Sequence, residues 1–153
     1  MHTSRGLTMV EIVVSLAIVL LVASIGTFAF QTYRRSVDLD AMGDSIVAAL
    51  ELAKSQALAG KNGLASGVKF TSTTYTTFNA NTYSSSDASN KTYTVSNGFE
   101  LVSTIPGPDN DIIFARMTAL PSAVGTITVR NISNTSEKRT ITVGNLGDIT
   151  VVK

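Results

Sequence analysis

The chain has 153 residues, with twelve basic and eleven acidic side chains and a formal net charge of +1. Because these charges are scattered singly and form no basic stripe, the composition does not support binding to nucleic acid. The absence of cysteine excludes disulfides, thiolate metal sites and cysteine nucleophiles. The single histidine, His2, lies in a segment that we expect to be removed, so histidine-based catalysis or metal binding is not expected.

The first predicted element is a helix of membrane length. Residues 12–30 are nineteen positions without a charge, or about 28 Å of helix against a hydrocarbon core of about 30 Å. A secretory signal would have a shorter apolar stretch and a small-residue cleavage site, whereas "QTYRRS" follows here. Tyr33 suits the membrane interface, and Arg34 and Arg35 suit a polar stop. The simplest alternative is a plain single-pass membrane anchor. Because Arg5 lies on one side of the helix and Arg34 and Arg35 lie on the other, the positive charges do not settle its orientation in the membrane.

The segment before this helix reads "RGLTMVE". It resembles the N-terminus of type IV prepilins and of the pseudopilins of type II secretion. In that family a prepilin peptidase cuts after the glycine and usually methylates the new amine. The resemblance therefore implies cleavage between Gly6 and Leu7, N-methylation of Leu7, and a role in filament assembly for Glu11. The chain departs from the family in having Leu7 instead of the common phenylalanine, and in lacking a proline within the apolar helix.

Glu11 needs a physical explanation, because a carboxylate in an apolar helix costs up to about 3 kcal/mol and is usually paired. The resemblance implies that, in a staggered helical bundle, the amine at Leu7 of one subunit lies beside Glu11 of its neighbour and compensates the charge. The alternative is that Glu11 only reaches to the lipid headgroups.

The helical pattern continues beyond the membrane-length segment. Apolar residues recur at steps of three and four, and predict an amphipathic helix whose buried face comprises Leu39, Met42, Ile46, Ala49, Leu50, Ala53 and Ala57. Its other face is expected to carry Asp38, Asp40, Asp44, Glu51 and Lys54. Gly60 is well placed as a C-terminal cap and Gly63 as a turn. We therefore expect one long helix over about residues 8–59.

Strand-forming segments follow Gly63. They are "GLASGVKF", "TYTTF", "TYTVSNGFELV" with a turn at Asn97-Gly98, "DIIFA", "GTITVRNI", "RTITVG" and "DITVVK". Ile127 and Val129 alternate with polar neighbours, which indicates a half-buried antiparallel strand. The predicted fold class is α+β: a long N-terminal helix packed on a small antiparallel β head that buries the helix's apolar face.

The C-terminal strands carry a second resemblance. From "IIFARMTALPSAVGTITVRN" to "RTITVGNLGDITV", the order of strands is similar to the closing part of the GspH/FimT group of minor pilins and pseudopilins. The matching positions are Phe114, Ile127 to Val129, Arg139 to Val143, and Gly147. Some relatives carry arginine-rich final strands used in DNA uptake, whereas the last strand here offers only Lys153.

Two other segments are candidate sites. The Ser/Thr/Asn-rich region 71–97, with Tyr75, Phe78, Tyr83 and Tyr93, is either an exposed loop for partner contact or, as we favour, a solvated hairpin whose aromatic residues cover the sheet. Asp109-Asn110-Asp111 offers oxygen ligands for calcium, but two carboxylates in one turn favour a polar turn. No catalytic constellation or phosphate loop occurs, so we expect neither an enzyme nor a cofactor.

The resemblances imply a minor pilin or minor pseudopilin, a structural subunit of a type IV pilus or a type II secretion filament, near the tip or in assembly initiation. Two alternatives remain: a DNA-uptake minor pilin that binds nucleic acid through its head, and a single-pass membrane protein with an enzymatic or sensory head. The expected partners are other pilin or pseudopilin subunits through the N-terminal helix, prepilin peptidase and the inner membrane. Nucleic acid is not an expected partner.

The expected organisation is a leader peptide (1–6), a transmembrane and assembly helix (7–33), an amphipathic stem helix (34–60) and a β-rich periplasmic head (61–153). The protein would be held in the inner membrane by a single span and then assembled into a periplasmic or surface filament.

Overall fold

The computed structural model describes residues 8–107 and 109–152, without the side chains of residues 25, 26, 28 and 29. The fold is α+β, with one long helix followed by antiparallel strands. The chain divides into two compact units, one ending at Val37 and the other beginning at Asp38. Each unit is described separately below, and we call the second unit the head.

Helix α1 (Met9–Leu58) contributes to both units. Its bounds confirm the single long helix that the sequence predicts. The helix ends at Leu58, and Gly60 two residues later adopts the left-handed conformation (φ 61°, ψ 33°) that glycine reaches without steric cost. Gly63 is also left-handed, at φ 72°. A short 3-10 helix (Lys61–Gly63) then leads into the strands.

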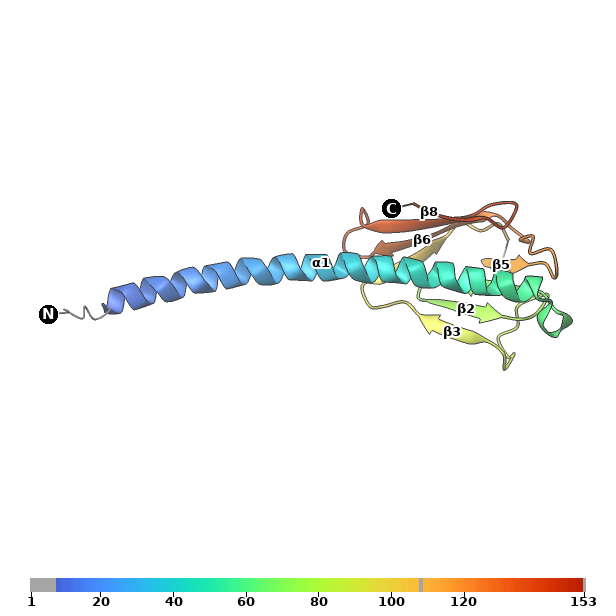
Figure 1. Cartoon of the computed structure of the whole chain (residues 1–153), viewed down its shortest axis with the longest axis horizontal. Coiled ribbons are helices and arrows are strands. Elements are labelled where there is room, and N and C mark those ends of the chain that lie inside the picture. The colour runs from blue at the N-terminus through green and yellow to red at the C-terminus, as the bar shows by residue number, and fades with distance from the viewer. Residues whose placement is uncertain (1–7, 108, 153) are drawn as a thin grey trace. The chain divides into compact units, whose positions relative to one another are not determined.

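The head contains eight strands: β1 (Ser66–Phe70), β2 (Thr74–Phe78), β3 (Lys91–Thr94), β4 (Phe99–Ser103), β5 (Asp111–Phe114), β6 (Gly125–Asn131), β7 (Lys138–Val143) and β8 (Ile149–Val152). They form two four-stranded sheets with the orders β3-β2-β1-β5 and β4-β6-β7-β8, and every pairing is antiparallel. In Figure 1 the second half of α1 runs along the head between β2 and β3 on one side and β6 and β8 on the other.

The chain crosses from the first sheet to the second at β4 and back to the first at β5. The chain leaves the first sheet after β3, adds β4 to the second sheet beside β6, and returns to add β5 beside β1. The turn predicted at Asn97-Gly98 is present, with Gly98 at φ 94°. It does not close a hairpin, however, because the strands on its two sides belong to different sheets.

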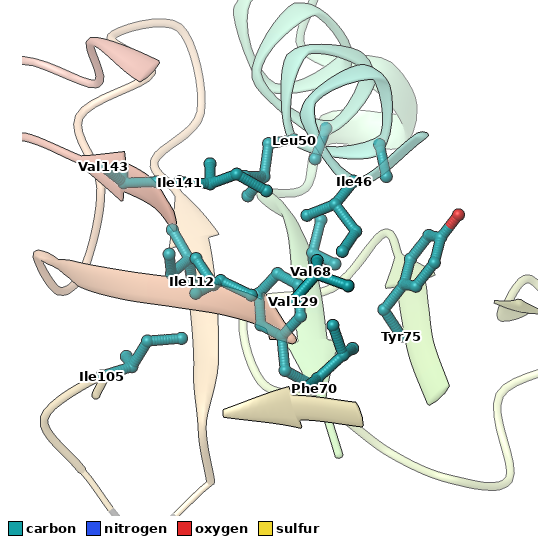
Figure 2. Close-up of a cluster of buried hydrophobic side chains, with 14 of the residues drawn as sticks. Ile46, Leu50, Val68, Phe70, Tyr75, Ile105, Ile112, Val129, Ile141 and Val143 are labelled. Carbon is teal, nitrogen blue, oxygen red and sulfur yellow. The ribbon is translucent and has the colours of Figure 1, made fainter. Parts of the chain in front are cut away.

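The core of the head lies where the helix meets both sheets. Figure 2 shows Ile46 and Leu50 pointing from the helix toward Val68 of the first sheet and Val129 of the second. The predicted apolar face is confirmed, because Leu39, Ile46, Ala49, Leu50, Ala53 and Ala57 are all buried and Met42 is partly buried against the same cluster. Burying a large aliphatic side chain is worth about 1.5–3 kcal/mol, so this cluster holds the stem half of the helix to the sheets.

Two residues of the other face of the helix, Asp40 and Lys54, form bonds with the second sheet and with the turn between its last two strands. Asp40 accepts a hydrogen bond from Arg139 of β7, with Nε and Oδ1 2.5 Å apart. Lys54 donates from its Nζ to the carbonyl oxygen of Gly147 at 2.8 Å. These two positions flank the apolar face, where a long or charged side chain reaches polar groups at the rim of a sheet.

Candidate assembly site

The predicted processing positions, Gly6 and Leu7, lie outside the described residues. Glu11, the third predicted site residue, lies in the first turn of α1. Its backbone N–H donates to Thr8 Oγ1 at 3.3 Å, and its Oε2 accepts from the backbone N–H of Thr8 at 3.5 Å. This reciprocal arrangement is a capping box, in which two amides left unpaired at a helix start are satisfied by side chains.

The capping box gives Glu11 a role within its own chain. A carboxylate in the first helical turn also interacts favourably with the helix dipole, by about 0.3–1 kcal/mol at an exposed site. Thr8 was not singled out from the sequence, although the spacing of Thr8 and Glu11 is the Thr-x-x-Glu pattern of such a box. A carboxylate near the start of an apolar helix therefore has two physical explanations, one local and one intermolecular.

The helix that follows carries apolar side chains exposed to their surroundings. Among the large ones, exposure runs from 48% at Ile12 to 83% at Met9. The set comprises Met9, Val10, Ile12, Val13, Val14, Leu16, Ile18, Val19, Leu20, Leu21 and Val22. Monomeric soluble proteins rarely expose a contiguous apolar surface of this kind, which marks a site of association with protein or lipid.

Two hydroxyl side chains farther along the helix bond to its own backbone. Ser24 Oγ donates to the carbonyl oxygen of Leu21 at 2.7 Å, and Thr27 Oγ1 donates to that of Ser24 at 2.9 Å. Such bonds to the preceding turn remove the cost of placing a hydroxyl among apolar neighbours. Over the residues that are described, no helix meets the length and hydropathy that a membrane crossing requires, and the expected single span is not confirmed.

The Ser/Thr/Asn-rich region is a hairpin, as favoured from the sequence. Tyr75 and Phe78 are buried on β2, and Tyr93 of β3 stacks on Tyr75 with ring centroids 5.1 Å apart. The ring of Tyr83 meets that of Phe78 edge-on at 5.3 Å. Burial raises the pKa of the Tyr75 hydroxyl. The aromatic residues of this region therefore cover the sheet and one another.

The two carboxylates of the Asp109–Asp111 turn have different surroundings. Asp109 Oδ1 lies 3.4 Å from Lys69 Nζ, and burial, followed by the charge of Asp109, raises the pKa of Asp111. In the part of the chain that is described, no three His, Cys, Asp or Glu side chains come together in a metal-binding group.

Both the sequence and the fold resemble those of known proteins. Over residues 42–147, more than half of the chain, the sequence matches the profile of the family described as type II transport protein GspH. The fold is similar to that of the minor pseudopilin EpsH from the type 2 secretion system of Vibrio cholerae, with a TM-score of 0.59 and 13% identity, covering 75% of this chain and 96% of that one. No curated protein matches the chain. Of the two filament systems that the sequence left open, the family points to type II secretion, and nothing in these comparisons supports DNA uptake. The chain belongs to the GspH family of type II transport proteins.

Proposed function

We propose that this protein is a minor pseudopilin, a structural subunit of the type II secretion filament and the substrate of a processing peptidase, not itself an enzyme. The observation that carries this proposal is the family match over residues 42–147, which covers most of the stem helix and nearly all of the strands. The α+β fold, with a stem helix packed on two antiparallel sheets, supports it.

The surface by which this subunit joins others is the apolar part of α1. Its large side chains are exposed in the single chain, and packing them against equivalent helices would remove that surface from water or lipid. The head would then lie beside other heads at the filament surface.

Processing is proposed at the bond between Gly6 and Leu7, with methylation of the new amine. The support is the order of Arg5, Gly6, Leu7 and Glu11 directly before an apolar helix. Mass spectrometry of the intact protein from cells with an active prepilin peptidase should show loss of residues 1–6 and a gain of one methyl group. Retention of Met1 would contradict the proposal.

Before assembly, residues 7–33 would hold the subunit in the inner membrane with the head in the periplasm. The support is the uncharged run of residues 12–30 followed by Arg34 and Arg35. Full-length protein should remain in the membrane fraction after alkaline extraction, and protease added to spheroplasts should remove the head. Extraction with the soluble proteins would contradict this arrangement.

Glu11 is proposed to pair with the amine at Leu7 of a neighbouring subunit. Because Glu11 also closes the capping box, an alanine variant would remove both roles at once. Glu11→Gln separates them, since glutamine also completes a capping box but carries no charge. Thr8→Ala is the matched opposite, because it removes the hydroxyl of the box and leaves the charge of Glu11 in place.

The measurement is the incorporation of each variant into crosslinked pseudopilin complexes, with cleavage at Gly6 monitored in the same samples. If the ion pair drives assembly, Glu11→Gln should be cleaved normally and incorporated poorly, while Thr8→Ala should be incorporated well. Normal incorporation of Glu11→Gln would assign the carboxylate to the capping box alone.

A further inference from the structure

Strand β3 leaves one edge of its sheet open. It pairs with β2, and no described strand lies on its other side (Figure 1). Val95 donates its N–H to the carbonyl oxygen of Thr73, so alternate residues before it, Tyr93 and Lys91, also turn their backbone groups toward β2. The backbone groups of Thr92 and Thr94 therefore face away from the sheet. An open edge of this kind is a template for a further strand.

A cavity of about 300 Å³ lies between this part of the sheet and the helix. Its wall on α1 is made of small and apolar residues, including Ala48 and Leu52, and its floor includes Tyr75 and Tyr93. Leu52 and Tyr93 are 45% and 41% exposed. This half of the groove can take an apolar side chain from a segment that lies along β3.

A second cavity of about 280 Å³ continues the groove and shares Leu52 and Thr77 with the first. Its lining contains two cations, Lys61 and Lys91, and no carboxylate. Within the described residues neither lysine forms an ion pair. This half of the groove therefore complements a negative charge.

Asn90, one of the residues that line this cavity, holds the loop after β2 in place. Its Nδ2 donates to the carbonyl oxygen of Ser84 at 2.7 Å.

We propose that the groove between α1 and β3 binds an extended acidic segment of a partner protein, which adds as a strand to the free edge of β3. From Ser45 to Gln56 the helix wall measures about 16 Å, which an extended segment of about five residues would span. Backbone hydrogen bonds to Thr92 and Thr94 would fix it, with an apolar side chain over Tyr93 and a carboxylate between Lys61 and Lys91. This proposal concerns the head alone and does not depend on how the N-terminal helix is processed.

The probes are fluorescent peptides of seven residues with blocked ends. One reads Thr-Val-Thr-Val-Thr-Asp-Thr and the other has the reverse order, because the direction of pairing is not assumed. Each has a counterpart in which lysine replaces the aspartate. Anisotropy is measured with the full chain in detergent micelles, and empty micelles serve as the blank. At least one acidic peptide should bind, and its lysine counterpart should bind about fivefold more weakly or worse.

Variants test the two parts of the groove. Lys61→Glu combined with Lys91→Glu should reverse the preference to the lysine peptide, while Lys138→Glu, an exposed lysine of the other sheet, should leave it unchanged. Ala48→Trp should fill the apolar cavity and abolish binding. Ala41→Trp is its matched control, since Ala41 is exposed on the same helix but does not line the groove.

Backbone pairing is tested by methylating alternate amides of the peptide. Methylation of the amides that face β3 should abolish binding, and methylation of the others should not. Three results would overturn the proposal: no binding of either acidic peptide at millimolar concentration, equal binding of acidic and lysine peptides, or insensitivity to Ala48→Trp. Self-association of the wild-type chain that Ala48→Trp abolishes would assign the groove to a second copy and would also overturn it.

Discussion

The ion pair between Arg139 and Asp40 should respond unequally to loss of its two members. The Arg139 side chain is only 16% exposed, whereas that of Asp40 is 37% exposed. Removing the carboxylate leaves a mostly buried guanidinium without its anion, while removing the guanidinium leaves a carboxylate that water can reach. The two losses differ because a charge that stays buried without its counter-ion keeps its desolvation cost, whereas an exposed charge is hydrated.

We expect Asp40→Asn to lower the free energy of unfolding by about 2 kcal/mol, below the range for fully buried pairs because Asp40 is partly solvated. For a head of this size that corresponds to a decrease in Tm of about 8 °C. Arg139→Leu should cost about 1 kcal/mol or less, because Asp40 can be hydrated and leucine keeps the apolar contact beside Gly43. The double variant should cost less than the sum of the two single variants.

The assay is urea unfolding of the full chain in detergent micelles, followed by circular dichroism. The control is Arg130→Leu, which breaks a pair of similar geometry, Arg130 Nε to Glu100 Oε1 at 2.7 Å, whose members are 38% and 30% exposed. That variant should cost about 0.5 kcal/mol. If Arg139→Leu proves more damaging than Asp40→Asn, the reasoning from burial is refuted.

Three further predictions concern single positions. Gly67→Ala should destabilise the head by about 1–3 kcal/mol in urea unfolding, since an added Cβ would lie 2.7 Å from the ring of Phe78 and from a carbonyl oxygen of β5. The control is Gly43→Ala, which should be neutral or stabilising because its Cβ would meet only Arg139, at 3.6 Å. Burial raises the pKa of Asp111 in the folded state, so the charged carboxylate disfavours folding at pH 7. Asp111→Asn should therefore stabilise the protein at pH 7. This gain in stability should shrink as the pH falls toward 3.8, the ordinary pKa of an aspartate, because the wild-type carboxylate then becomes protonated. Thr8→Ala should weaken the first turn of α1 by about 1 kcal/mol, seen as faster hydrogen exchange at Glu11, and unchanged exchange would show that the capping box contributes nothing.

The local pattern of the sequence predicted the elements well because each has a signal of its own. The spacing of three and four residues around Ile46 and Leu50 predicts one buried helix face, whatever packs against it. The alternation at Ile127 and Val129 predicts one buried face of a strand in the same way. Gly60 at the helix end needed no knowledge of the rest of the fold. These signals arise from period and backbone freedom alone.

Strand pairing carries no such local signal. Asn97-Gly98 is a strong turn sequence, yet its flanking strands separate because β4 finds β6 and β5 finds β1 across long stretches of chain. The contacts of Asp40 and Lys54 were missed for the same reason, since their partners Arg139 and Gly147 are distant in sequence. The capping box at Thr8 and Glu11 is different, because its Thr-x-x-Glu spacing is local and visible in the sequence.

The exchange of β4 and β5 between the sheets bears on how the head opens. The connection from β3 to β4 is four residues (95–98) and that from β4 to β5 is seven (104–110), so neither sheet can detach without pulling a strand out of the other. One sheet should therefore not unfold while the other stays folded, and the head should unfold as one cooperative unit. Amides in Val68 of the first sheet and Val129 of the second should then exchange with the same free energy of opening. A load applied to the stem would meet the resistance of both sheets together.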